Sequence, residues 1–373
     1  MGKNKQWIDK FRDKTGWKIL DAYILRKFLG SVVYAIMLLM TIIIVFDLSE
    51  NIQRFMDKAI PVKDIIFKYY FNFIPYFINL FIPLFTFISV IWFTSKLSSH
   101  NEIISITGNG VSFKRFMLPY LVGSVIIVIL SLIMSNFVVP KTNERLNDFK
   151  FNNFGKATIS TTYLHVKNSG DSYIFIERWD RSSERGYNAT YEEFDGASIR
   201  YKITAQIISY DENEQKWIMR DCVCRRIEKD KEYIDIRDKI DTTFNVLPRN
   251  FDQDVFVSET MSFTELQQFI HEEKVRGSSL VAHYQIEAHK RVANPLGIII
   301  MTFLGLSVSF RKNVRGVGVH IFMGMGLAFT FIFLQQVSTV FSVSGGLPPV
   351  LGTWIPNLIF LVITIGMLKF VSK

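Results

Sequence analysis

The sequence lacks the short motifs that mark most nucleotide-binding and hydrolytic chains. It contains no G-x-x-x-x-G-K-[ST] phosphate-binding loop, no G-x-S-x-G nucleophile elbow and no H-E-x-x-H zinc motif. Its 6 histidines are scattered, and the closest pair, His283 and His289, would not share a helical face. These absences argue against a catalytic centre, so we expect a protein that is not an enzyme and that binds no cofactor or metal of its own.

Cysteine is also scarce. The chain has only 2 cysteines, Cys222 and Cys224, which leaves no disulfide framework. Two positions apart on an extended strand, they would point to one face together with Ile218, in a geometry that disfavours a mutual disulfide. A metal site would need further ligands nearby. We therefore interpret both cysteines as ordinary strand residues.

Apolar residues, by contrast, are abundant. Hydrophobic residues make up 49% of the chain, including 34 phenylalanines, and charged residues make up 21%. This composition is too apolar for an ordinary soluble domain and too charged for a bundle of membrane helices alone, which predicts membrane spans joined to one polar domain. The formal net charge of +9 fits lysines and arginines that flank membrane spans, so we expect no nucleic-acid partner.

Six apolar stretches are long enough to cross a bilayer, which takes about 20 helical residues. The first is longer than a signal-peptide core and is followed by no small-residue cleavage site, so we expect an uncleaved span. Pro75 and Pro83 lie inside the second stretch and should bend it. The predicted spans are 28–46, 69–93, 116–139, 292–310, 317–341 and 350–368. Small residues in the fifth span offer surfaces for close helix packing, namely Gly316, Gly318, Gly324, Gly326 and Ala328.

The basic residues of the short loops predict the orientation. One side of the membrane carries the basic N-terminal tail and most of the loop lysines and arginines, whereas the other side carries Arg54, Lys58 and Lys63. We therefore expect both termini in the cytoplasm and the polar block between the third and fourth spans outside it. The cytoplasmic set is Arg26, Lys27, Lys96, Lys114, Arg115, Arg311, Lys312, Arg315, Lys369 and Lys373.

The polar block has the pattern of a β domain. Alternating stretches separated by turn signals predict strands at 171–179, 201–209, 216–227 and 231–238, arranged as a sandwich or jelly roll. The sequence leaves open whether one apolar face forms the core or an acyl-chain groove; its residues are Tyr201, Ile203, Ala205, Ile207, Ile174 and Ile176.

A helix is predicted at 262–277, with Ser262 and Glu265 as a capping box. The predicted fold is a membrane α-helical bundle of six transmembrane helices with an inserted all-β, jelly-roll-like periplasmic domain. Its domains are the N-terminal tail with the first three spans (1–139), the β domain (140–261), and the connecting helix with the last three spans (262–373).

The stretch "SSHNEIISITGNGVSFKRF" (98–116) predicts a short helix between the second and third spans. Ser99 and Glu102 fit a capping box, and Gly108 fits a left-handed residue that ends the helix at about 107. Ser112 is expected to cap the next helix. Such an element is either an interhelical turn on the membrane surface or a rigid helix that docks into a cytosolic ATPase. One apolar face is expected from Ile103, Ile104 and Thr107, with Ile106 alongside.

Two segments make the chain similar to a known family. "NEIISITGNGVS" (101–112) and "YQIEAHKRVANPLG" (284–297) resemble the transmembrane permease family of the lipopolysaccharide export ABC transporter, its F- and G-type subunits. The similarity extends from "LDAYILRKFLGS" (20–31) to "LPPVLGTWIPNLIF" (347–360), an ending closer to the G type. The resemblance implies a permease of a Gram-negative inner membrane that extracts lipopolysaccharide and passes it to a periplasmic bridge.

The resemblance also implies partners. These are a second, F-type permease subunit, two copies of a cytosolic ATPase that binds ATP and Mg, periplasmic jelly-roll proteins, and lipopolysaccharide itself. The segment that would couple to the ATPase contains Ser99, Glu102, Ile103, Ile104, Ile106, Gly108 and Gly110.

Lipopolysaccharide carries phosphates, so basic residues near the outer ends of the spans are candidate contacts. Several family members have a basic residue near the outer end of the first span, whereas this chain has Asp47 and Glu50 there and a cation only at Arg54. Asp47 is expected to pair with a basic residue of the partner subunit. The candidate contacts are Arg54, Lys58, Lys63, Lys68, Arg145, Lys150, Lys290 and Arg291.

Two other functions remain open from the sequence. One is a mechanotransmission or lipoprotein-release permease that moves no lipid through its spans, although such proteins typically have four spans. The other is a membrane scaffold that transports nothing.

Overall fold

The computed structural model describes residues 19–154, 160–180, 183–196, 198–211, 214–228, 231–246, 248, 257–276, 278, 280–310 and 317–371. The basic tail (1–18) lies outside these residues, as do Arg311, Lys312, Arg315, Gly316 and Lys373. The chain divides into two compact units. The first comprises Met1–Asp57, Pro61–Asn143 and Ala288–Lys373, and the second comprises Lys58–Ile60 and Glu144–Glu287.

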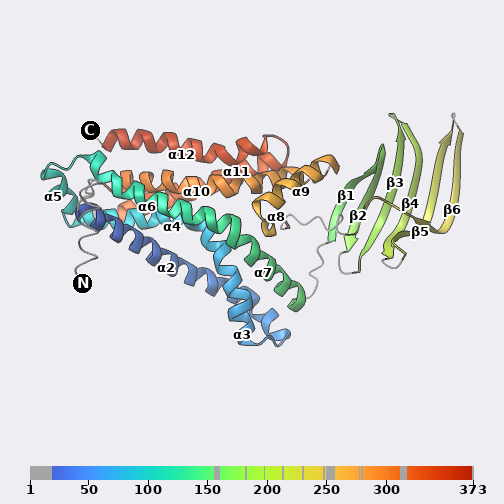
Figure 1. The fold of residues 1–373 in the computed structure, drawn as a ribbon, viewed down its shortest axis with the longest axis horizontal. Coiled ribbons are helices and arrows are strands. Elements are labelled where there is room, and N and C mark those ends of the chain that lie inside the picture. Colours follow the sequence, from blue (N-terminus) through green and yellow to red (C-terminus); the bar gives the residue numbers. More distant parts are fainter. Residues whose placement is uncertain are drawn as a thin grey trace, which may run out of the picture. The chain divides into compact units, whose positions relative to one another are not determined.

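Helices build the first unit (Figure 1). Two of them cross its bounds, so that residues 144–153 and 281–287 belong to the second unit. Six of the described helical segments are long and apolar enough to cross a membrane, which confirms the predicted number of spans. The helices extend beyond the predicted apolar stretches at most of their ends. Their bounds are α2 (Ile19–Asp57), α3 (Val62–Asp64), η1 (Ile65–Tyr70), α4 (Phe71–Ser99), α5 (Glu102–Gly108), α6 (Phe113–Ile133), η2 (Met134–Val138), α7 (Val139–Asn153), α10 (Val281–Ser309), α11 (Val317–Val343) and α12 (Pro349–Val371).

Prolines interrupt the second span, and π turns occur in the second and third spans. Pro75 and Pro83 both lie inside α4, where each removes a backbone N–H donor from the helix. The π-helical turn η1 immediately precedes α4, and a second one, η2, joins α6 to α7. π turns of this kind loosen the regular hydrogen-bond pattern of a long helix.

Two apolar clusters hold the bundle together. In the first, Phe28 of α2, Phe93 of α4 and Tyr120 of α6 pack among buried aliphatic side chains. The second joins α4 to the C-terminal helices, with Phe331 of α11 packed edge-on against Phe360 of α12 at 4.9 Å between ring centroids. A Cβ at Gly324 of α11 would overlap Ile91 of α4, so this glycine permits close helix packing.

The second unit contains one sheet of six antiparallel strands (Figure 1). Each strand pairs with its neighbours in sequence, so the sheet is a meander in strand order. The second sheet that the predicted sandwich or jelly roll would have is not among the described residues. The predicted strands at 201–209, 216–227 and 231–238 fall within β4, β5 and β6, and the one at 171–179 overlaps β2, which begins at Ser172. β1 and β3 were not predicted. The strands are β1 (Ser160–Ser169), β2 (Ser172–Asp180), β3 (Arg185–Asp195), β4 (Ser198–Asp211), β5 (Lys216–Glu228) and β6 (Lys231–Thr242); the helices α8 (Val257–Thr260) and α9 (Phe263–Arg276) follow.

An aligned row of irregular positions crosses the sheet. Between β2 and β3 the ladder omits Glu177 opposite Asn188, and between β4 and β5 it omits Gln206 opposite Asp221. Asn188 and Asp221 have φ values of 52° and 53°, in the left-handed region that asparagine and aspartate tolerate better than most residues. The pairing register is the same on both sides of this row, whereas the buried face of each strand changes parity there.

The change of parity corrects one sequence expectation. On β5 the buried residues are Trp217 and Met219 before the irregular row, and Cys222 and Cys224 after it, whereas Ile218 points away from this set. The cysteines are free and buried, as expected of ordinary strand residues. No group of three or more potential metal ligands occurs among the described residues.

Most of the apolar face that the sequence left open between core and groove belongs to the core, but Ile207 lies outside the buried cluster and Ile208 is buried in its place. Ile174, Ile176, Ile203 and Ala205 are at most 5% exposed and pack in one buried cluster. Trp217 belongs to the same cluster, and its indole N–H donates to the Val246 carbonyl at 2.8 Å.

Candidate functional site

The short helix predicted between the second and third spans is α5, but its ends differ from the prediction. Ser99 is the last residue of α4, and its hydroxyl donates to the Lys96 carbonyl instead of capping α5. Asn101 stands at the N-cap position with φ 62°, and its side chain makes no capping hydrogen bond to α5. The predicted capping box of Ser99 and Glu102 is therefore wrong, because α4 continues to Ser99 and uses its hydroxyl.

The C-terminal end of α5 also differs. Gly108 is the last helical residue, and the left-handed residue is Gly110, with φ 80°. The amide of Gly110 donates to the Thr107 carbonyl at 3.0 Å, which closes the turn. Ser112 caps α6 as predicted, since its hydroxyl accepts from the Arg115 amide.

The side chains of α5 divide between the bundle and its surface. Ile103 is 3% exposed and belongs to the apolar cluster of α2, α4 and α6, with Ile106 packed against it. Ile104, expected on the same face, is 57% exposed instead. The helix is therefore held to the bundle by Ile103 and Ile106 and presents Ile104 outward.

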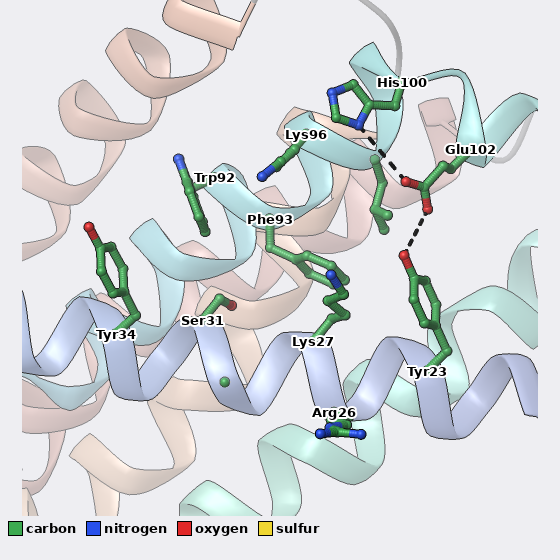
Figure 2. A pocket seen from close by; sticks show the side chains of 12 residues that line it. Tyr23, Arg26, Lys27, Ser31, Tyr34, Trp92, Phe93, Lys96, His100 and Glu102 are labelled. Atoms are coloured by element: carbon green, nitrogen blue, oxygen red, sulfur yellow. Dashed lines mark hydrogen bonds and ion pairs between the residues drawn. The ribbon is translucent and has the colours of Figure 1, made fainter.

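Glu102, the first residue of α5, bonds to the first span. The Tyr23 hydroxyl of α2 donates to Glu102 Oε2 at 3.1 Å, and His100 Nδ1 lies 4.0 Å from Oε1 (Figure 2). Beside it, Arg115 at the start of α6 forms an ion pair with Asp21 of α2, which is 2% exposed. Because a buried carboxylate needs such a partner, this pair fixes α6 against α2 next to α5.

Further polar contacts join α4 to the C-terminal helices near α5. Ser95 of α4 contacts His320 Nδ1 of α11 at 2.9 Å. The Ser98 hydroxyl donates to the Phe310 carbonyl at 3.3 Å. The segment around α5 is therefore connected to α2, to α11 and to the residue that follows α10.

A groove of about 800 Å³ lies next to α5, between α2 and α4 (Figure 2). It contains Tyr23 and Glu102 together with two lysines that the sequence analysis used only for orientation, Lys27 and Lys96. Sequence reasoning missed the groove because its two walls are far apart along the chain, and the only signal was the pair of basic residues at one end of the first two spans.

A polar cluster surrounds Asp47 of α2. The Tyr69 hydroxyl and the Asn51 side-chain amide donate to Asp47 Oδ1 at 3.1 and 3.2 Å. Arg54 donates to the Asn51 oxygen at 3.2 Å, so Arg54 is linked to Asp47 through Asn51. Asp47 thus has partners within its own chain, and the sequence signal that was missed is the tyrosine at the start of the second span.

The remaining candidate phosphate contacts are distributed over both units. Lys63 and Lys68 are exposed in the first unit, and Lys68 forms an ion pair with Asp64 at 3.2 Å. Lys290 is half-buried and Arg291 is 3% exposed. Lys58 and Arg145 are exposed and Lys150 is half-buried in the second unit. That these cations contact the phosphates of lipopolysaccharide stays a prediction.

Comparison with known proteins covers almost the whole chain. The sequence model of the lipopolysaccharide export system permease LptF/LptG family matches residues 22–369. The lipopolysaccharide export system permease protein LptG of Haemophilus influenzae is 23% identical over 356 residues, which cover 92% of this chain and 96% of the relative. The protein of the same name from Escherichia coli strain K12 is 20% identical over 302 residues, or 79% of this chain and 82% of the relative.

The match extends over both the bundle and the sheet, and over the segments 101–112 and 284–297 that carry the resemblance. The six candidate spans and the inserted antiparallel sheet agree with a permease that crosses the membrane several times. The chain therefore belongs to the lipopolysaccharide export system permease LptF/LptG family.

Proposed function

We propose that this chain is the transmembrane permease subunit of an ATP-driven exporter, which extracts lipopolysaccharide from the inner membrane and passes it to a periplasmic bridge. The observation that carries the proposal is the family match over residues 22–369, which includes the helix bundle and the β unit alike. The named relatives are G-type permeases, and we assign the chain to that type.

The orientation follows from charge. Arg26, Lys27, Lys96, Lys114 and Arg115 all lie at the helix ends next to α5. By the positive-inside rule this end faces the cytoplasm, and the β unit, inserted at the opposite helix ends, is periplasmic. The protein then has both termini in the cytoplasm.

Coupling to a cytosolic ATPase is assigned to α5. This helix presents Ile104 and part of Glu102 outward while Ile103 anchors it in the bundle. A push on α5 would reach α2 through Tyr23 and Glu102, and α6 through the turn at Gly110. The ATPase, present in two copies, would bind ATP and Mg, while this chain contributes movement of its spans.

Two other partners are assigned to surfaces of the chain: one to an exposed apolar helix face and one to an edge of the sheet. Phe322, Met325 and Phe329 of α11 are 54–75% exposed, and Gly326 has open space around it. This face of α11 suits close packing against an F-type permease. Among the strands that the structure describes, β6 pairs with β5 alone, so its outer edge suits strand addition by a periplasmic jelly-roll protein.

Arg54 is the phosphate contact that the geometry favours in the first span. Its link through Asn51 to Asp47 holds the guanidinium near the outer end of α2. A guanidinium suits bidentate binding of phosphate. The acidic Asp47 would then orient Arg54 and would not itself meet the lipid phosphates.

Depletion of the protein in its native cells tests the export function. Lipopolysaccharide should then accumulate in the inner membrane, as measured by fractionation of the two membranes, and re-expression should restore delivery. Normal delivery after depletion would contradict the proposal. Retained lipoproteins with normal lipopolysaccharide delivery would favour a lipoprotein-release permease instead, although the six candidate spans support the exporter.

A further inference from the structure

The groove between α2 and α4 has no role in the export function proposed above. Its lining comes from α2, from α4 and from the residues that lead into α5, all in the first unit. It has a volume of about 800 Å³, and Figure 2 shows the side chains that line it. The groove is thus a candidate binding site at the basic end of the bundle.

Three cations, Arg26, Lys27 and Lys96, line the groove. Figure 2 shows Lys27 and Lys96 pointing into the space between the helices. Neither lysine forms an ion pair with a carboxylate in the part of the chain that the structure describes; their ammonium groups lie over the rings of Tyr23 and Trp92, at 5.7 and 5.5 Å. The three cations outnumber the one carboxylate of the lining, Glu102, so the local potential favours an anionic ligand.

Aromatic side chains continue the groove away from the charged end. Tyr34 and Trp92 stack with their centroids 5.9 Å apart, and they are 56% and 42% exposed. At 1.5 Å per residue, Lys27 lies about 10 Å and Lys96 about 6 Å beyond this pair along their helices. Cations at the level of headgroups, followed by aromatic rings at the interface, match the cross-section of one lipid leaflet.

We propose that this groove binds an anionic phospholipid of the cytoplasmic leaflet. Lys27 and Lys96 contact the headgroup phosphate, and Tyr34 and Trp92 line the path of an acyl chain. The proposal rests on the proposed orientation, in which this end of the bundle is cytoplasmic. A soluble phosphate would use only the two lysines, whereas a lipid uses the lysines and the exposed aromatic pair.

The position of the groove makes a bound lipid a neighbour of the coupling segment. Tyr23 and Glu102, hydrogen-bonded at 3.1 Å, stand among its lining residues. A phosphate between Lys27 and Lys96 would therefore lie beside the contact that joins α5 to the first span. Lipid in the groove would stabilise α2 and α4 in the arrangement that holds this contact.

Lipid retention tests the site. The full-length chain in its complex is purified in nanodiscs of phosphatidylcholine that contain a minor share of phosphatidylglycerol, and retained lipids are counted by native mass spectrometry. Lys27→Gln and Lys96→Gln should each lower retention of phosphatidylglycerol about fivefold, the effect of one lysine at a membrane surface. Lys27→Arg should retain it.

Lys114→Gln is the matched control, because Lys114 is exposed on α6 at the same end and lies outside the groove. Equal retention in the three glutamine variants would overturn the proposal, as would displacement of the lipid by inorganic phosphate. Loss of the second permease subunit from Lys27→Gln, with phosphatidylglycerol still bound, would overturn it in favour of a subunit contact. Because the measurement uses neither ATP nor lipopolysaccharide, its outcome is independent of the export assay.

Discussion

Glu102 combines two features at one residue: it bonds to Tyr23 within the chain, and its side chain is 37% exposed. We expect Glu102→Gln to weaken binding of the ATPase roughly tenfold, because the amide keeps an oxygen for Tyr23 but loses the charge that would pair with a basic group of the ATPase. Titration of the purified permease complex with ATPase subunit measures the change.

Tyr23→Phe is the control for Glu102→Gln. It removes the internal hydrogen bond and leaves the carboxylate in place, so ATPase binding should change little. If the two variants weaken binding equally, Glu102 acts by holding α5 on α2 and not by contacting the ATPase.

The cysteines offer a second test at the residue scale. Burial raises the pKa of the Cys222 thiol to about 11, with further contributions from Cys224 and Asp221. Since the thiolate is the reactive form, Cys222 should not react with Ellman's reagent at pH 8 in the folded chain and should react after denaturation. Rapid labelling of the folded protein would show that the sheet opens at β5.

The turn between α5 and α6 depends on a glycine in the left-handed conformation. Gly110 has φ 80°, and an alanine there would adopt a left-handed conformation at a cost of about 1–2 kcal/mol. Gly110→Ala should therefore reduce ATPase stimulation by the permease, which is measured as the hydrolysis rate of the complex. Gly108→Ala is the matched control, because Gly108 is helical with open space around it, and it should be neutral.

The N-terminus of α9 is a capping box, as the sequence predicted. The Ser262 amide donates to Glu265 Oε2 at 2.8 Å, and the Glu265 amide donates to the Ser262 hydroxyl at 3.4 Å. Hydrogen bonds from the Ser262 amide and hydroxyl lower the Glu265 pKa below its ordinary value of 4.5. The stabilisation is therefore present above that value and lost as the pH falls through the lowered pKa.

Hydrogen exchange of the α9 amides at pH 7 and at pH 3 measures this effect. Protection of the first turn should fall at the lower pH, and Glu265→Gln should remove most of the difference between the two. Ser262→Ala should destabilise the helix by about 1 kcal/mol at pH 7. A first turn that is equally protected at both pH values would contradict the capping account.

Some elements were predictable and others were not, for physical reasons. Long apolar stretches identify the spans by hydropathy alone, and alternation identifies β2, β4, β5 and β6. The sequence did not predict β1 and β3, because they are rich in polar residues and are held in place by the strands beside them. The irregular row at Asn188 and Asp221 was not predicted either, because asparagine and aspartate in the left-handed conformation leave no distinct sequence pattern.

On the scale of the whole molecule, family membership was visible in the segments 101–112 and 284–297, and the match over residues 22–369 bears it out. The site was less accessible to sequence reasoning. The partners of Glu102 and Asp47, namely Tyr23 and Tyr69, lie on other helices, and only the folded bundle brings each pair together.

The central claim is that this chain moves lipopolysaccharide when a partner hydrolyses ATP. Proteoliposomes that contain the permease pair, the ATPase and lipopolysaccharide measure it directly, by transfer of lipopolysaccharide to a periplasmic acceptor protein. We expect transfer that requires ATP and this chain, and that falls in Glu102→Gln. Transfer of equal rate without this chain, or without ATP, would contradict the account.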